Sequence, residues 1–302
     1  MKFKFDVEGR SQADPFIFED QGKFYLYVTG DKGVEAYVGE SLDGIWKYQG
    51  EICAFEGCSG FWAPSIIKYE GMYYIYTSCN EGEFSEYMMV MSSENPLGPF
   101  GNRKVLYDRF SIDSHIVQTG AGLFLFYAED NKDGDKIGTR IYVDKMLDPY
   151  TPAGICKEIL TPDFREEIFQ LNRFGDGRDW YTLEGPFWFR KGEYQYLMYS
   201  AGCFMDDTYH LGYAVAKTDE EDLTKVNWTK HTLDGRFDPV MMKNEYEEGT
   251  GHNSVIKIED QYYVVYHARD YEKDGNPHWK CRSGRFCPMQ VEDGVLILNR
   301  NN

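Results

Sequence analysis

One pattern recurs five times along this chain: a short apolar run, a turn containing Gly, Asp, Glu or Lys, and then an alternating aromatic run. Two strand-like runs around such a turn indicate a β-hairpin. The fold must therefore accommodate five similar hairpins. The repeats begin at residues 14, 63, 113, 185 and 252 and read DPFIFEDQGKFYLYV, APSIIKYEGMYYIYT, DSHIVQTGAGLFLFY, GPFWFRKGEYQYLMY and HNSVIKIEDQYYVVY.

The spacing of the repeats suggests how the hairpins are organised. They lie roughly 50 to 70 residues apart, which leaves room for about four strands each, as a β-propeller blade requires. Helical periodicity is hard to find, and no Gly-, Ser- or Pro-rich linker divides the chain. Closing the units into a ring would leave few strand edges exposed. We therefore predict an all-β chain that forms a single domain, a five-bladed β-propeller over residues 1–302.

Charge and aromatic content narrow the choice of partners. The chain has 32 basic and 50 acidic residues, a formal net charge of −18, whereas binding to a polyanion depends on Lys and Arg. Nucleic acid and membrane are therefore not expected partners. Aromatic residues make up 17% of the chain, and they favour strands and offer flat faces to sugar rings or bases. Composition alone does not choose between these ligands, and it leaves the oligomeric state open.

Cysteine spacing and the first residues suggest a compartment. Seven cysteines are scattered without a Cys-x-x-Cys pair, so neither a zinc site nor a disulfide framework is indicated. The start, MKFKFDVEGR, lacks the apolar core of a signal peptide, and no stretch of about 18 apolar residues occurs. The sequence as it stands predicts reduced thiols and a cytoplasmic location, unless a leader has been removed.

In a ring of blades, equivalent positions at the start of each repeat converge on one cavity. These positions carry Asp14, the Trp62-Ala63-Pro64 step, Asp113, Glu184, which lies one residue before its repeat start, and His252. Two carboxylates across a pocket can cleave a glycosidic bond, because one protonates the leaving oxygen while the other activates water or attacks carbon. A third carboxylate can tune the first two. Asp14 could merely begin an Asp-Pro turn, but a buried unpaired Glu184 would be costly without a function.

Five motifs in order, ADPFIF, WAPSI, SIDSHI, LEGPF and GTGHNSV, resemble those of glycoside hydrolase family 43 over essentially the whole chain. The resemblance implies a five-bladed propeller and an inverting enzyme of the β-D-xylosidase, α-L-arabinofuranosidase or arabinan-degrading type. It implies Asp14 as general base, Glu184 as general acid and Asp113 as the residue that raises the pKa of the acid. Inverting enzymes hold the acid and base carboxyls about 6.5–9.5 Å apart. Where many members read Ile-Asp-Pro, this chain has Ser114 after Asp113, which leaves the orientation of that carboxylate open.

Further site residues follow from the same resemblance. His252 matches the central histidine of the family, which in several members contacts a calcium ion directly or through water. We therefore consider His252 both a substrate contact and a candidate ligand of Ca²⁺ at the propeller axis, although Ca²⁺ prefers oxygen ligands and the chemistry requires no cofactor. The segment GRFCPMQVEDG resembles a last-blade strand whose arginine reaches the sugar hydroxyls, so Arg285 is the expected substrate contact and Arg282 the alternative.

Aromatic residues beside the carboxylate motifs are candidate walls of the pocket. Trp62 and Phe16 are the expected substrate contacts, with Trp62 as a sugar platform, whereas we expect Phe187 to pack between blades. The sequence thus predicts an exo-acting hydrolase that removes β-D-xylosyl and/or α-L-arabinofuranosyl units from the non-reducing end of xylo- or arabino-oligosaccharides. The alternatives are an endo-1,5-α-L-arabinanase and a propeller that binds sugar without catalysis, which would not need an acid and base pair.

Overall fold

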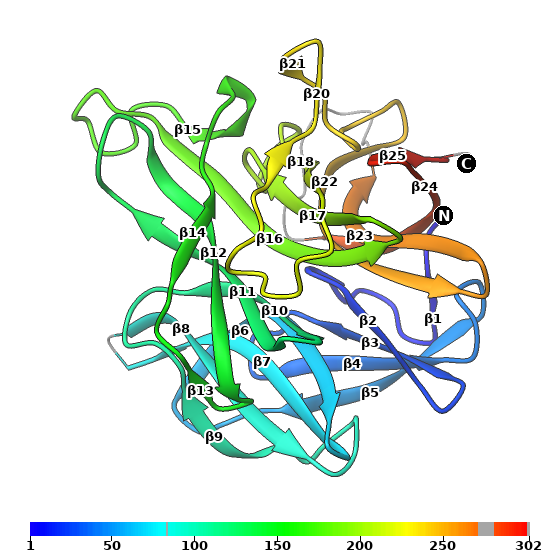
Figure 1. The fold of residues 1–302 in the computed structure, drawn as a ribbon. Coiled ribbons are helices and arrows are strands. Elements are labelled where there is room, and N and C mark those ends of the chain that lie inside the picture. The colour runs from blue at the N-terminus through cyan, green and yellow to red at the C-terminus, as the bar shows by residue number, and fades with distance from the viewer. Residues whose placement is uncertain (83, 271–280, 301–302) are drawn as a thin grey trace.

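The chain folds almost entirely into β-strands (Figure 1). The computed structural model describes residues 1–82, 84–270 and 281–300. Within these ranges the only helical segment is a 3₁₀ turn, Arg165–Glu167. No helix among the same residues has the length and apolar character needed to cross a membrane. The predicted all-β class is confirmed.

Each of the five predicted hairpins forms an antiparallel strand pair. In the first, Gln21 and Gly22 have φ angles of 53° and 74°, as a two-residue turn that matches the strand twist requires. The alternation of apolar residues then gives each strand a buried face. The pairs are β2 (Phe16–Asp20) with β3 (Lys23–Val28), β6 (Cys58–Tyr69) with β7 (Met72–Glu81), β10 (Ile112–Thr119) with β11 (Gly122–Asn131), β16 (Trp180–Lys191) with β17 (Tyr194–Ala201), and β22 (Glu247–Ile258) with β23 (Gln261–Asp270).

Further strands extend these hairpins or lie in the connections between them. Most pair with the second strand of a hairpin or with the strand that follows it. They are β1 (Lys4–Phe5), β4 (Val34–Gly39), β5 (Ile45–Cys53), β8 (Phe84–Ser93), β9 (Gly101–Val105), β12 (Ile137–Asp148), β13 (Thr151–Pro152), β14 (Lys157–Leu160), β15 (Ile168–Gln170), β18 (His210–Lys217), β19 (Thr229–Lys230), β20 (Thr232–Leu233), β21 (Arg236–Phe237), β24 (Ser283–Glu292) and β25 (Val295–Leu298).

Strand pairing groups these elements into sheets. One sheet has the order β1-β5-β4-β3-β2, and two four-stranded sheets have the orders β6-β7-β8-β9 and β22-β23-β24-β25. The third and fourth hairpins share one ten-stranded sheet, because Ile137 to Thr139 of β12 pair in parallel with Trp180 to Thr182 of β16. The predicted number of five blades therefore stays a prediction.

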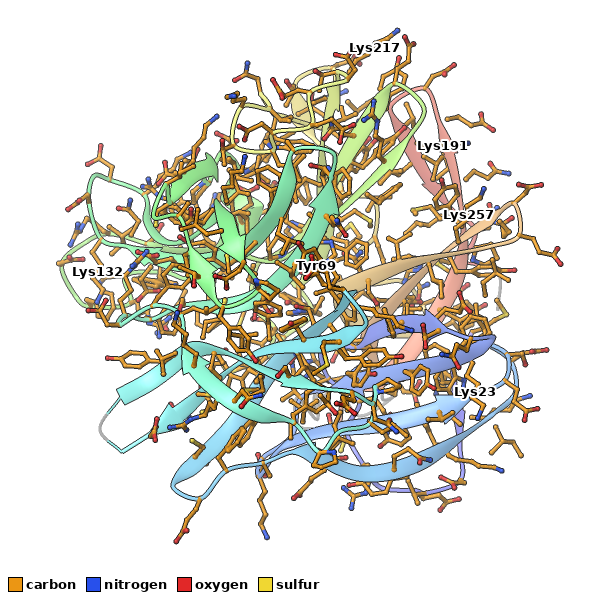
Figure 2. The ribbon with its side chains drawn as sticks, turned by 60° about the horizontal axis from the view of Figure 1, so that its bottom comes forward. Lys23, Tyr69, Lys132, Lys191, Lys217 and Lys257 are labelled. Carbon is orange, nitrogen blue, oxygen red and sulfur yellow. The ribbon has the colours of Figure 1, made fainter. Side chains whose placement is uncertain are left out.

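The hydrophobic core lies between neighbouring sheets, where side chains fill the space (Figure 2). Leu26 and Trp46 of the first sheet are fully buried against Val265 and Phe286 of the last. This contact brings the two chain ends together (Figure 1). The first strands of the hairpins contact one another all the way round, β2 with β6, β6 with β10, β10 with β16, β16 with β22, and β22 with β2. Residues at equivalent points of these strands are thus brought together.

Candidate active site

A repeated backbone irregularity lies at an equivalent point of each of these five hairpins, just before β2, at the second residue of β10, and within β6, β16 and β22. The residue at that point has a positive φ angle: Asp14 (55°), Ala63 (44°), Asp113 (61°), Gly185 (57°) and His252 (47°). In β6, β10, β16 and β22 the pairing register shifts at the same point, which indicates a bulge. Left-handed backbone is unfavourable for most residues, and such strain clusters at functional sites. The five irregularities therefore mark the candidate site.

The residue before each irregularity occupies a second equivalent position. Glu184 precedes Gly185 on β16, and Trp62 precedes Ala63 on β6. The carboxyl of Glu184 and the indole of Trp62 therefore come from matching points of two strands. Trp62 is 39% exposed, which is unusual for a tryptophan and leaves its ring available to a ligand.

Asp14 is a buried carboxylate that is held in its charged form. Its Oδ2 accepts a hydrogen bond of 2.5 Å from Thr29 Oγ1, and its Oδ1 accepts one of 3.1 Å from Arg282 Nη1. Burial raises its pKa, but the charge of Arg282, the nearby imidazoles and the Thr29 hydrogen bond outweigh that effect and hold the pKa well below its usual range. Asp14 is therefore ionised at neutral pH, which is the protonation state that a general base needs.

His267 is a neighbour of Asp14 that the sequence analysis missed. Its Nδ1 accepts a hydrogen bond of 3.1 Å from the backbone N–H of Asp14 and lies 3.4 Å from Asp14 Oδ1. An accepting Nδ1 carries no proton, so the ring is neutral. Burial is the main cause that lowers its pKa well below the usual range, and the charge of Arg282 adds to it. The hydrogen bond supports the strained backbone at Asp14, and the only signal in the sequence is the histidine that follows the aromatic run YYVVY.

Asp113 and Glu184 come from neighbouring hairpins and are linked through the backbone. Asp113 Oδ2 accepts a hydrogen bond of 2.9 Å from the N–H of Gly185, the residue after Glu184. Burial, followed by the negative charges of Glu184 and Asp14, raises the pKa of Asp113 well above its usual range. Asp113 therefore fixes the strand that carries Glu184.

Glu184 has the protonation behaviour of an acid rather than a base. Its Oε1 accepts a hydrogen bond of 2.6 Å from the hydroxyl of Tyr209, a second residue that the sequence analysis missed. Burial raises the pKa of Glu184 to about 7; the charge of Asp14 acts in the same direction, and the Tyr209 hydrogen bond opposes it. At neutral pH a large fraction of Glu184 can thus carry a proton while Asp14 does not, which separates the two carboxyls into a donor and an acceptor.

His252 lies between two of the carboxylates. Its Nδ1 is 3.5 Å from Asp14 Oδ1 and 3.8 Å from Asp113 Oδ2, and its backbone N–H donates to Ser200 Oγ at 2.7 Å. A Cβ atom on Gly185 would come within 3.2 Å of the same Nδ1, so the glycine allows the strands to approach closely. Burial lowers the pKa of His252, against the opposing effect of Asp14.

The residues around His252 do not fit a calcium ion held by the protein. Within the described ranges, no group of three or more His, Cys, Asp or Glu side chains could hold a metal. The adjacent cavity has a volume of about 10 Å³, and its unpartnered polar atoms are Asn253 Oδ1 and His115 Nδ1. Ca²⁺ takes roughly six to eight oxygen ligands, which this set does not supply. A calcium requirement stays a prediction, and no step below uses one.

The three aromatic candidates differ in their surroundings. The rings of Phe16 and Phe187 lie 6.0 Å apart, and Phe187 stacks on His115 at 4.1 Å. Both phenylalanines line the small cavity beside His252. Phe187 thus packs as expected, and Phe16 shares that packing. Trp62 alone of the three has a large exposed fraction.

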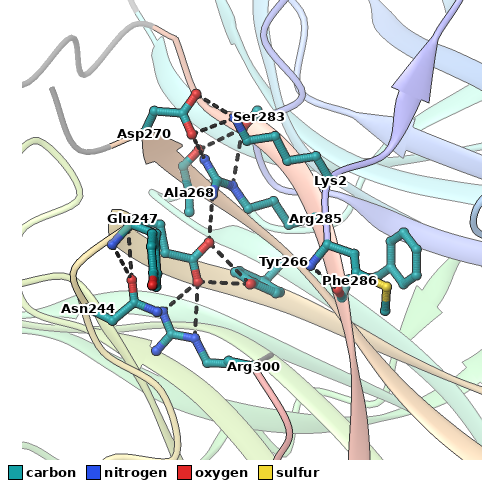
Figure 3. Close-up of polar contacts among 12 residues, drawn as sticks. Lys2, Asn244, Glu247, Tyr266, Ala268, Asp270, Ser283, Arg285, Phe286 and Arg300 are labelled. Atoms are coloured by element: carbon teal, nitrogen blue, oxygen red, sulfur yellow. Dashed lines mark hydrogen bonds and ion pairs between the residues drawn. The ribbon is translucent and has the colours of Figure 1, made fainter. Parts of the chain in front are cut away.

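The choice of Arg285 as the substrate contact needs correction. Arg285 is 4% exposed and donates to Glu247 Oε2 at 2.7 Å and Asp270 Oδ1 at 3.0 Å (Figure 3). Its guanidinium group is thereby fully engaged in a different cluster. Arg282 lies just before β24, donates to Asp14, and borders a hollow of about 650 Å³ together with Ala13 and Thr29. Arg282 is therefore the arginine of the site.

Comparisons with known proteins agree on one family. A sequence model of "Glycosyl hydrolases family 43" matches residues 7–296. Alpha-L-arabinofuranosidase 43 of Humicola insolens is 25% identical over 290 residues, which cover 88% of this chain but only 56% of that relative. Extracellular exo-alpha-(1->5)-L-arabinofuranosidase ArbA of Cellvibrio japonicus (strain Ueda107) is 24% identical over 299 residues, 87% of this chain and 80% of the relative. The crystal structure of a thermostable family-43 glycoside hydrolase superposes with a TM-score of 0.82 and 28% identity over 99% of this chain and 96% of that one.

Proposed function

The chain belongs to glycosyl hydrolase family 43, and from this premise we propose that it is an inverting exo-glycosidase. It removes α-L-arabinofuranosyl or β-D-xylosyl units from the non-reducing end of short oligosaccharides. The observation that carries the proposal is the opposite protonation behaviour of Asp14 and Glu184 in one cluster. A five-bladed propeller is the architecture we propose, supported by the closed succession of contacts among the first strands.

The reaction follows from the two protonation states. Glu184 donates its proton to the glycosidic oxygen as the bond to the anomeric carbon breaks. Asp14 takes a proton from a water molecule whose oxygen forms the new bond on the opposite face of the sugar, so the anomeric configuration inverts. Asp14 then releases its proton to solvent and Glu184 regains one. This scheme requires the two carboxyls to lie about 6.5–9.5 Å apart.

Three neighbours assist these steps. Asp113 holds the strand of Glu184 through the Gly185 amide, and the two carboxyls disfavour ionising together, because the charge of Glu184 raises the pKa of Asp113. Arg282 keeps Asp14 ionised and can also donate to a sugar hydroxyl at the edge of the hollow that it lines. Trp62 offers a ring face to the sugar.

Both relatives are named as arabinofuranosidases, which favours arabinose over xylose as the sugar released. We propose both activities. The two sugars present similar hydroxyls, and a small difference in pocket fit discriminates by only about 1–3 kcal/mol. The endo-arabinanase is the second candidate, because the hollow of about 650 Å³ that Ala13, Thr29 and Arg282 line could accommodate more than one sugar unit.

The purified chain should release 4-nitrophenol from the α-L-arabinofuranoside or the β-D-xyloside, and single sugars from arabino- or xylo-oligosaccharides. Proton NMR during the first turnovers should show the inverted anomer. Internal cleavage of linear arabinan without release of single sugars would instead establish the endo activity. Sugar binding without hydrolysis would leave only a binding protein. Parallel assays with a chelator test whether any of these activities requires Ca²⁺.

A further inference from the structure

A fourth buried carboxyl, that of Glu86 on β8, lies close to the site and has no role in the mechanism above. Glu86 is 1% exposed. Within the described part of the chain it makes no ion pair, and its Oε2 has no hydrogen-bond partner. A buried carboxyl without a cation is costly if ionised and is uncommon without a function. Glu167 provides a contrast, because it is equally buried but pairs with Lys230 Nζ at 2.6 Å.

Asn80 holds Glu86 at two points. Asn80 Oδ1 accepts a hydrogen bond of 3.2 Å from the backbone N–H of Glu86, and Asn80 Nδ2 donates one of 2.7 Å to Glu86 Oε1. Glu86 itself has a φ angle of 54°, which is unfavourable for a glutamate. The two hydrogen bonds therefore stabilise a strained backbone and fix the carboxyl at the same time.

This clamp is connected to the site on two sides. The carbonyl of Glu86 accepts a hydrogen bond of 3.0 Å from the N–H of Ser111, which stands two residues before Asp113. On the other side, a Cβ atom on Gly60 would lie 3.1 Å from Asn80 Nδ2, 3.2 Å from Trp62 Nε1 and 3.5 Å from Glu86 Oε1. The clamp thus lies between the start of the strand that carries Asp113 and the indole of Trp62.

We propose that Glu86, as a neutral carboxyl clamped by Asn80, is a positioning residue that sets Asp113 and Trp62 relative to one another. The inference rests on the proposed function, because its effect on the reaction passes through Asp113. The titratable groups that face Glu86 are Asp113 from β10 and Cys79 from β7, and neither is a cation. Ionisation of Glu86 would therefore place an uncompensated charge beside Asp113. In agreement with this geometry, burial raises the pKa of Glu86 to about 8, against the weaker opposing effect of the Asn80 hydrogen bond.

The first test compares Glu86→Ala, Glu86→Gln and Asn80→Ala with the wild type on an oligosaccharide substrate near pH 6. A misplacement near 1 Å can reduce kcat by about 100-fold, so we expect losses of roughly 10- to 100-fold for Glu86→Ala and Asn80→Ala. KM should change less than kcat, since neither residue touches the sugar and only the Trp62 ring, which the clamp also positions, contributes to its binding. Glu86→Gln imitates the neutral carboxyl and should restore most of kcat. Glu167→Gln is the matched control: it loses stability but keeps kcat.

The dependence of kcat on pH distinguishes a positioning role of Glu86 from a merely structural one. A 4-nitrophenyl glycoside has a good leaving group and needs little help from Glu184, so an alkaline loss of kcat with this substrate reports on another group. We expect that loss in the wild type near the pKa of Glu86, about 8, and a weaker one in Glu86→Gln. Wild-type kcat in Glu86→Ala, or the same alkaline loss in Glu86→Gln as in the wild type, would overturn the inference.

A stability measurement keeps this inference separable from the proposed function. Because the folded protein holds Glu86 protonated, the wild type loses stability relative to Glu86→Gln as pH rises from about 4.5 to about 8, and the difference is constant above that. Urea unfolding midpoints at several pH values should follow this course even if no glycoside is hydrolysed. A pH-independent difference would show that Glu86 is not held neutral and would refute the clamp.

Discussion

Two clusters of buried charge in this molecule are built in opposite ways. Around Glu247, one carboxylate meets Arg285 at 2.7 Å, Arg300 at 2.5 Å and the hydroxyl of Tyr266 at 3.0 Å (Figure 3). In the candidate active site, three carboxyls share the single cation Arg282 among the described residues. The cluster around Glu247 is compensated in charge and the active site is not.

This difference in charge compensation distinguishes carboxylates that stabilise the fold from carboxyls suited to proton transfer. The arginines outweigh burial and lower the pKa of Glu247, so that it stays ionised and joins β22 to β24 and to the C-terminal segment. In the active site the missing cations leave Glu184 and Asp113 with raised pKa values. A group that must release and regain a proton near neutral pH needs such an environment, although it reduces stability.

The largest predicted effect tests the role of Glu184 as the acid, and its failure would remove the contrast between the two clusters. Glu184→Gln removes the proton donor, so kcat on oligosaccharides should fall by roughly 10²- to 10⁴-fold. On a 4-nitrophenyl glycoside, whose leaving group needs little protonation, the loss should be much smaller. Steady-state kinetics on both substrates measure the ratio, and product binding by calorimetry checks that the pocket is intact. Equal losses on both substrates would mean that Glu184 does not act as the acid.

The next largest effect concerns the compensated cluster. Glu247→Gln leaves Arg285 and Arg300 without their shared counter-charge, and breaking a buried ion pair costs about 3–5 kcal/mol. The free energy of unfolding, measured in urea at pH 7, should fall by that order, while kcat at a temperature where the variant stays folded should not change. Because the pKa of Glu247 is lower in the folded protein, its ionised carboxylate stabilises the fold fully above about pH 4.5. That stabilisation is lost as the pH falls through the pKa of the folded state. A loss of kcat without a loss of stability would place Glu247 in the catalytic machinery.

The sequence predicts local structure well because the signals for it are local. Period-two aromatic runs and two-residue turns located all five hairpins, and the positions at or just before the repeat starts identified Asp14, Asp113 and Glu184 as a group that the fold brings together. Three neighbours were missed, Thr29, His267 and Tyr209. Each is a single polar residue near the end of another strand, and its use depends on pairing between distant segments.

The choice between Arg282 and Arg285 also depended on the fold and could not be made from the sequence. Arg282 and Arg285 are three residues apart in a segment whose motif does not distinguish them. Arg285 lies within β24 opposite Tyr266, whereas Arg282 lies just before that strand, next to the segment that leads into β2. Only the backbone path decides which guanidinium group reaches Asp14. The pairing of β12 with β16 was likewise unpredictable, since no turn connects them.

The smallest predicted effect is a change in the free energy of unfolding at Glu184, and its sign is opposite to that of the change expected for Glu247→Gln. Because the folded pKa of Glu184 is raised to about 7 from its ordinary 4.5, the folded protein resists ionisation of this group that the unfolded chain allows. Glu184→Gln should therefore stabilise the fold at pH 8 by about 1–2 kcal/mol, less than the full pKa shift implies, because Glu184 is half-buried and solvent screens part of its charge. The gain should be absent below about pH 4.5, grow up to about pH 7 and then stay constant.

Urea unfolding of Glu184→Gln and the wild type at pH 4, 6 and 8 measures this course, with Glu247→Gln as the control of opposite sign. If both variants lost stability at pH 8, the active site would be as well compensated in charge as the cluster around Glu247, and the contrast between the two would fail. If only Glu184→Gln gained stability, the carboxyl proposed as the acid would also lower the free energy of unfolding when it is ionised. The physical reason is that three carboxyls share the single cation Arg282 among the described residues, so a further negative charge there is unfavourable.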